Sequence, residues 1–269
     1  MLKVKRAICW LRRDIRLSDH APLAEACRRA DEVAVLFVFD RRILDPLVDR
    51  DDSRVTFIHR SLAELDDGLR ARGSRLLVAH GHPVEEVPAF AQRWGAEALF
   101  TGDDYEPHAQ ARDRAVAKEL SALGCEFLSI KDHVVFHKDE VLNGFGEPFK
   151  VFTPFMKAWR FRLGPADYVE HRPDFSRLAR FDETDERLHL PSLDRLGFSE
   201  GRPWLEPGEQ AASARLESFL SKLPDYGKHR DMVSAEATSG LSAHLRFGTI
   251  SVRECVRAAL SRPSSESEK

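Results

Sequence analysis

Short apolar runs alternate with longer stretches of helical periodicity through the first 130 residues. Five runs predict strands, at residues 7–11, 33–39, 76–79, 98–101 and 127–130. Between these runs apolar residues recur every three or four positions, as at Leu62, Leu65 and Leu69, which predicts helices. Strands separated by helices require right-handed crossovers and a parallel sheet. The pattern therefore predicts an α/β fold with a doubly wound, five-stranded parallel sheet.

The pattern changes twice after residue 130. Residues 151–163 predict a helix that begins near Thr153 and Pro154, since proline is compatible with a first helical turn. Residues 164–207 are rich in Pro, Asp, Glu and Arg and lack a sustained period, and helical spacing returns from Gly208. We expect an α/β domain over residues 1–135, a connector with short helices over 136–207, a helical segment over 208–262 and a polar tail over 263–269.

The composition is that of an ordinary folded protein. The chain has 269 residues, 42% of them hydrophobic, and a net charge of −3, so any contact with DNA must come from a local basic patch. Its four cysteines lie far apart without a C-x-x-C pair, which indicates reduced thiols rather than a disulfide or zinc framework. The apolar run 7–11 is too short for a signal sequence, and no stretch reaches membrane-spanning length. We expect a cytoplasmic protein.

Charged residues gather where the predicted strands end. Arg12 follows the first strand, and the loop after the fourth carries Asp103, Asp104, Glu106 and His108. Because ligands of parallel sheets bind beyond the carboxyl ends of the strands, these residues are candidates for a pocket that takes a polar aromatic ligand. The alternative is that loops at strand ends are simply polar.

Several common sites are excluded by missing motifs. No G-x-G-x-x-G follows the first strand, and neither a P-loop lysine motif nor a G-x-S-x-G elbow occurs, so dinucleotide, P-loop and serine-hydrolase sites are not predicted. His80 and His82 stand near the acidic loop in the predicted fold, but such residues are common at strand ends. We predict no metal site.

A cluster of hydroxyls precedes the last helical stretch. Thr238, Ser239 and Ser242 surround Gly240, a pattern that suits a pyrophosphate at a helix start or an ordinary helix cap. Residues 222–262 also carry seven Lys or Arg against four Asp or Glu, a local charge of +3. The basic surroundings favour the anion site.

Residues 238–251, Thr-Ser-Gly-Leu-Ser-Ala-His-Leu-Arg-Phe-Gly-Thr-Ile-Ser, resemble the flavin-binding motif of the DNA photolyase/cryptochrome family. Trp10-Leu-Arg-Arg-Asp-Ile-Arg-Leu17, Tyr105-Glu-Pro107 and the segment 150–159 match further landmarks of that family in order. The likeness runs from residue 7 to about residue 260 and is closest to microbial class I cyclobutane pyrimidine dimer photolyases.

The resemblance implies an α/β antenna domain followed by the first helices of an all-α FAD-binding domain. It implies light-driven, FAD-dependent repair of cyclobutane pyrimidine dimers by a monomer acting on damaged DNA, with the cofactor rather than a protein acid or base doing the chemistry. By position, Arg230 faces the DNA and Tyr226 contacts the flavin. The flavin phosphates are held by Thr238, Ser239, Gly240, Leu241 and Ser242.

Two departures from the family qualify this expectation. His108 and Ala109 stand where folate-binding members carry Asn-Glu, so folate is not expected, and a deazaflavin or another chromophore remains open as the antenna. The family's flavin domain continues beyond the position of Lys269, with its electron-relay residues. We therefore expect a C-terminally truncated sequence whose isolated chain binds FAD weakly and repairs nothing. The alternatives are a cryptochrome photoreceptor without repair and a non-catalytic chromophore-binding α/β module.

Overall fold

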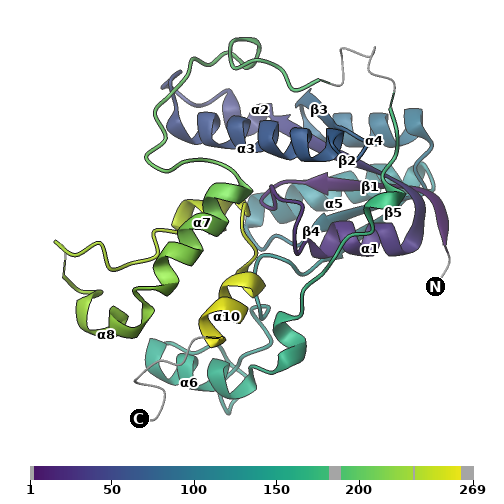
Figure 1. Cartoon of the computed structure of the whole chain (residues 1–269). Coiled ribbons are helices and arrows are strands. Elements are labelled where there is room, and N and C mark those ends of the chain that lie inside the picture. The colour runs from purple at the N-terminus through teal and green to yellow at the C-terminus, as the bar shows by residue number, and fades with distance from the viewer. Residues whose placement is uncertain (1–2, 182–188, 233, 262–269) are drawn as a thin grey trace.

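A five-stranded sheet forms the centre of the computed structural model, which describes residues 3–181, 189–232 and 234–261 (Figure 1). Every strand pair is parallel and the order is β3-β2-β1-β4-β5, so the winding reverses beside β1. The strands are β1 (Val4–Leu11), β2 (Ala30–Asp40), β3 (Leu76–Gly81), β4 (Ala98–Gly102) and β5 (Glu126–Ile130). The predicted doubly wound sheet is confirmed, and each predicted strand lies within an observed one.

Helices cover both faces of the sheet because side chains alternate along each strand. On one face, Ala7 and Cys9 of β1 share a core with α1 (Ala21–Arg29) and α3 (Ser53–Arg70). On the other, Ile8 and Trp10 pack with α4 (Pro83–Trp94) and α5 (Pro107–Ala122). A short α2 (Arg41–Leu44) follows β2. This arrangement turns the carboxyl ends of β1, β2 and β4 toward one edge.

The later helices lie beside this edge of the α/β part (Figure 1). The helix expected over residues 151–163 is α6 (Phe152–Arg162), and the expected connector holds the 3-10 helices η1 (Pro165–Tyr168), η2 (Phe175–Arg177) and η4 (Asp194–Leu196). Beyond them come α7 (Glu209–Leu220), η5 (Leu223–Asp225), α8 (Tyr226–His229), α9 (Ser242–Phe247) and α10 (Val252–Leu260). The expected polar tail 263–269 lies outside the described residues, and the domain boundaries stay predictions.

A buried ion network fastens α10 to the α/β part. Arg253 Nε lies 3.0 Å from Asp19 Oδ1, and its Nη2 lies 2.8 Å from Asp132 Oδ1. Arg16 pairs with the other Asp132 oxygen at 2.7 Å, and Arg257 pairs with Asp19 at 2.7 Å. Burial would raise the pKa of Asp132, but Arg16 and the neighbouring basic groups hold it far below its ordinary value. Two of the cations counted in the local charge of residues 222–262 are thus neutralised inside the molecule.

All four cysteines are free thiols. Burial raises the pKa of Cys27 to about 12 and that of Cys125 to about 11, so both act as apolar packing groups rather than reactive thiolates. Among the residues that the structure describes, no helix is long and apolar enough to cross a membrane.

Candidate functional site

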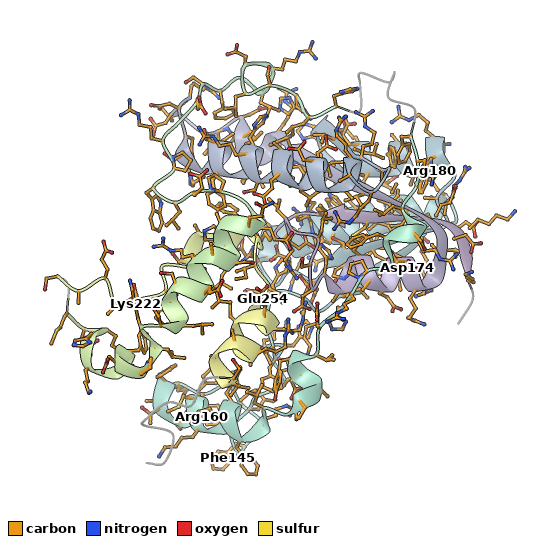
Figure 2. All side chains as sticks on the ribbon, in the orientation of Figure 1. Phe145, Arg160, Asp174, Arg180, Lys222 and Glu254 are labelled. Carbon is orange, nitrogen blue, oxygen red and sulfur yellow. The ribbon has the colours of Figure 1, made fainter. Side chains whose placement is uncertain are left out.

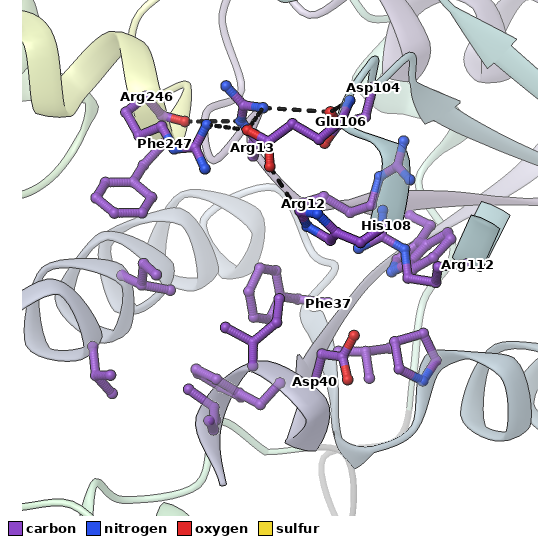
Figure 3. A pocket seen from close by; sticks show the side chains of 18 residues that line it. Arg12, Arg13, Phe37, Asp40, Asp104, Glu106, His108, Arg112, Arg246 and Phe247 are labelled. Atoms are coloured by element: carbon purple, nitrogen blue, oxygen red, sulfur yellow. Dashed lines mark hydrogen bonds and ion pairs between the residues drawn. The ribbon is translucent and has the colours of Figure 1, made fainter. Parts of the chain in front are cut away.

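A cavity of about 200 Å³ opens at the carboxyl ends of β1, β2 and β4 (Figure 3). It lies beside β1, where the strand order reverses, the usual place for a ligand in a doubly wound sheet. Strand ends, α2, α3, the loop between β4 and α5, and α9 all contribute to its wall. Segments far apart in the sequence therefore enclose one space.

Four of the five candidate pocket residues line this cavity, namely Arg12, Asp104, Glu106 and His108. The structure places Asp103 elsewhere. Its Oδ1 accepts a hydrogen bond from Ser129 Oγ at 3.0 Å, and its Oδ2 lies 3.4 Å from His137 Nδ1. Asp103 therefore pairs with β5 and the following loop rather than with the cavity.

Two arginines stack on one indole in the cavity wall. The guanidinium carbons of Arg12 and Arg112 lie 4.8 and 5.0 Å from the ring centroid of Trp10. Arg12 is held by Asp113, 2.5 Å from its Nη1, and by the carbonyl of Gly102. Burial, aided by the charge of Arg12, lowers the pKa of Arg112. The wall is therefore an aromatic plane with fixed positive charge beside it.

Glu106 joins the rim of the cavity to α9. Its Oε1 accepts from Arg246 Nη1 at 2.5 Å and from Arg13 Nη1 at 3.2 Å, and Arg13 Nε donates to the Arg246 carbonyl at 3.3 Å (Figure 3). The hydrogen bond from Arg246 lowers the pKa of Glu106. Burial would raise the pKa of Asp104, but the Glu106 N–H and the Arg13 guanidinium lower it. Both carboxylates are therefore ionised at neutral pH.

Apart from Asp40 at the end of β2, the rest of the wall is apolar. The rings of Phe37 and Phe39 meet edge to face with centroids 5.0 Å apart, and aliphatic groups of α2 and α3 continue the surface. Phe247 of α9 closes the same space. An apolar cleft with a few fixed polar groups is typical of sites for flat aromatic ligands.

The hydroxyl cluster lies on the helical part of the molecule. Thr238 and Ser242 are exposed, and neither hydroxyl has a hydrogen-bond partner among the described residues. Gly240 has a φ of +61°, and a Cβ there would clash with Arg215, whose Nε donates to the Ser239 carbonyl at 3.0 Å. Free hydroxyls, a left-handed glycine and a guanidinium thus form an open cradle that fits a diphosphate.

Tyr226 and Arg230 lie on α8 and at its C-terminal end. The Tyr226 ring meets Phe219 edge to face at 5.7 Å, and the Arg230 guanidinium lies 5.9 Å from the Tyr226 centroid. Arg230 is exposed. The geometry combines an aromatic ring with an accessible cation at the edge of the helical part.

A scan against family models matches residues 7–173 to the DNA photolyase family. The chain belongs to the DNA photolyase family.

Relatives of this photolyase-family chain include the deoxyribodipyrimidine photo-lyase of Synechococcus sp. strain PCC 6301. It is 36% identical over 93% of this chain and 52% of its own length. An uncharacterised 31.6 kDa protein of Synechococcus sp. strain PCC 6716 is 34% identical over 91% of this chain and 85% of its own length. Cryptochromes match at 30–31% identity. The chain spans about half the length of the photolyases and cryptochromes that it matches.

Solved structures agree with this assignment. A bacterial class III photolyase from Agrobacterium tumefaciens superposes with a TM-score of 0.83 and 25% identity over 99% of this chain and 55% of that one. An archaeal photolyase from Sulfolobus tokodaii with two FAD molecules gives a TM-score of 0.75 and 27% identity over 96% and 55%. The α/β part and the helices beside it therefore share the architecture of the first half of photolyases.

Some residues of this photolyase-family site did not emerge from the sequence. Arg246 and Phe247 belong to the recognised motif 238–251 but line the cavity rather than the hydroxyl cluster, and Arg215 of α7 lies against Gly240. The sequence signal that was available is Arg246, the one Lys, Arg, Asp or Glu in the segment 238–251. It could not show which face of α9 the α/β part covers.

One close group of possible metal ligands occurs among the described residues. Single atoms of Asp14, Asp132 and His133 lie within 4.8 Å of one another. Both carboxylate oxygens of Asp132 already accept hydrogen bonds from Arg16 and Arg253. The positive charge of these guanidiniums opposes a cation at this position.

Proposed function

We propose that this chain is the chromophore-binding half of a light-driven, FAD-dependent DNA photolyase. One observation carries the proposal: Arg12, Asp104, Glu106 and His108 line a single aromatic cavity that the flavin-motif helix α9 helps to close. In this proposal the cavity holds an antenna chromophore. The hydroxyl cluster forms one wall for FAD.

The cavity favours a flavin-like or deazaflavin-like ring system. Its apolar walls match the faces of a fused aromatic system, and the guanidiniums of Arg12 and Arg112 match ring carbonyl oxygens at one edge. Folate is disfavoured because His108 and Ala109 replace the polar pair of folate-binding members. A second flavin is a precedent, since the S. tokodaii photolyase was solved with two FAD molecules.

The cradle at Gly240 is proposed for the FAD diphosphate. The free hydroxyls of Thr238 and Ser242 donate to phosphate oxygens, and Arg215 supplies positive charge beside Ser239 and Gly240. Leu241 is buried beneath the cradle, and the ring of Tyr226 is available to contact the flavin. When bound, FAD supplies light-driven electron transfer.

Damaged DNA with pyrimidine dimers is the proposed partner. Arg230 is exposed at the end of α8, and its only ion pair among the described residues is an exposed one with Asp231 at 3.6 Å, so its guanidinium is accessible to a phosphate. A cryptochrome role remains the alternative at the level of the whole protein, and a light-dependent dimer-splitting assay separates the two. A photolyase splits the dimer and a cryptochrome does not.

A non-catalytic chromophore-binding module is the second candidate function. The 31.6 kDa relative favours it, since the matched region makes up 85% of that protein's own length. In this role the cavity alone would act. The cavity is common to both candidates and is the feature to test first.

Replacing Ile43 with tryptophan is expected to block the cavity. Ile43 is half exposed and lines the mouth, so the larger ring enters the space of the ligand without disturbing the core. We expect the dissociation constant for 8-hydroxy-5-deazaflavin or FMN to rise at least about tenfold, because the tryptophan ring overlaps the ligand. Fluorescence titration of the purified chain measures it.

Val48→Trp is the matched control. Val48 is an exposed aliphatic residue five positions further along that does not line the cavity, so this variant should bind as the unaltered chain does. Equal binding by both variants, or equal weakening in both, would place the ligand outside the cavity and overturn the proposal.

A further inference from the structure

A cationic and aromatic segment covers the end of the molecule formed by α6. Residues 148–164 contain four Lys or Arg and no Asp or Glu, in a chain of net charge −3. Phe161 is 95% exposed and Phe152 is 73% exposed. We call the exposed side chains of Lys150, Phe152, Lys157, Arg160 and Phe161 the α6 segment.

The inner side of α6 is already committed to packing. Trp159 and Leu163 pack on the small core of Val135, Phe136 and Val141, and the Trp159 ring meets Phe136 edge to face at 5.6 Å. The same core receives Val252 of α10. The helix is therefore fixed in place, and its outer side is what remains for a partner.

The outer side is free of internal partners. Lys157, Arg160 and Phe161 are spaced three and four residues apart, so they are neighbours on one side of the helix. Among the described residues, neither Lys157 nor Arg160 forms an ion pair or hydrogen bond. Figure 2 shows Arg160 and Phe145 at the end of the molecule below α10, where Phe145 adds another ring that is 92% exposed. Two cations and the exposed ring of Phe161 thus lie together on one side of α6.

We propose that the α6 segment binds single-stranded nucleic acid. Lysine and arginine attract the phosphate backbone, and exposed phenyl rings stack on unpaired bases, which is how single strands are held without sequence preference. A duplex offers its phosphates to the cations, but its bases stay stacked inside the helix and cannot stack on the phenyl rings. The proposal does not depend on the chromophore or on Arg230.

A lipid surface fits the segment less well. A helix that lies in a membrane interface buries its apolar face among the lipid chains. In α6 the inner face, with Trp159 and Leu163, is partly buried and packs on the core of Val135, Phe136 and Val141. The residues left outside are mixed cations and rings rather than an apolar stripe.

Fluorescence anisotropy with a labelled oligothymidylate of about 16 nucleotides tests the proposal. Lys157→Ala with Arg160→Ala is expected to weaken binding roughly tenfold and to lower the slope of log affinity against log salt by about 1.4, since two phosphate contacts are lost. Phe161→Ala is expected to weaken binding by roughly tenfold with little change in that slope. The unaltered chain should prefer the single strand to its duplex.

Arg114→Ala with Lys118→Ala is the matched control. These two cations are exposed on α5, four residues apart, and their removal changes the net charge equally. Equal weakening by the control pair, no binding of the oligonucleotide at low salt, or preferential binding of anionic lipid vesicles would each overturn the proposal. Self-association that masks the segment, detected by sedimentation and lost in Phe161→Ala, would likewise contradict it.

Discussion

Gly248→Ala is expected to detach α9 from the α/β part and to cost roughly 3–5 kcal/mol of unfolding free energy. Gly248 has a φ of +67°, and a Cβ there would lie 1.9 Å from the carbonyl oxygen of Arg13. The atoms that the Cβ would meet belong to the backbone of Arg13 and Asp14, so the movement of a side chain cannot relieve the clash. The chain can relieve the clash only by separating Gly248 from the loop after β1, where Ile15 N–H donates to the Phe247 carbonyl at 3.2 Å.

Gly144→Ala is the control for this glycine. A Cβ at Gly144 meets nothing within 4 Å, and its φ lies outside the left-handed region, so its midpoint in urea should match that of the unaltered chain. Circular dichroism during urea titration measures both variants. A Gly248→Ala midpoint equal to that of the control would show that α9 does not press against the β1 loop.

Arg253→Ala is expected to destabilise the chain by about 3–5 kcal/mol, because it leaves buried carboxylates without their partner. Arg253 is 4% exposed and donates to both Asp19 and Asp132 as well as to their backbone carbonyls. Arg16 and Arg257 cannot donate to every carboxylate and carbonyl oxygen of Asp19 and Asp132 that loses its hydrogen bond from Arg253. We expect α10 to lose its fixed position, seen as faster cleavage by protease between α9 and α10.

Arg41→Ala provides the comparison for a surface pair. The Arg41 guanidinium lies 3.1 Å from Asp45, and both side chains are about half exposed, so its loss should cost at most about 1 kcal/mol. Thermal unfolding of the two variants under one buffer compares them directly. Similar unfolding temperatures would mean that the Asp19 and Asp132 network does not hold the two parts together.

The sheet could be predicted from the sequence because its strands are buried on both faces. The run 33–39 is apolar throughout, and helices with clear periodicity separate it from its neighbours, so class and winding followed from pattern alone. Helix α6 was also predictable, since Pro154 and the apolar spacing mark its start. Such local patterns predict the elements correctly because the buried face of each element determines which of its positions are apolar.

The site was predictable only in part, because its geometry depends on contacts distant in sequence. Adjacent residues Asp103 and Asp104 point to different surroundings, the first to Ser129 and the second to the cavity. Arg253 reads as a basic surface residue in the sequence, but Asp19, 234 positions earlier, buries it. No local pattern encodes which partner a long side chain reaches across the fold.

The most direct test of the central claim is the amount of chromophore that the purified chain retains. The chain is incubated with 8-hydroxy-5-deazaflavin or FMN and desalted, and its visible absorption is compared with its protein content. We predict close to one retained chromophore per chain, lost in Ile43→Trp and kept in Val48→Trp. A colourless protein, or a chromophore retained equally by both variants, would contradict the assignment of the cavity.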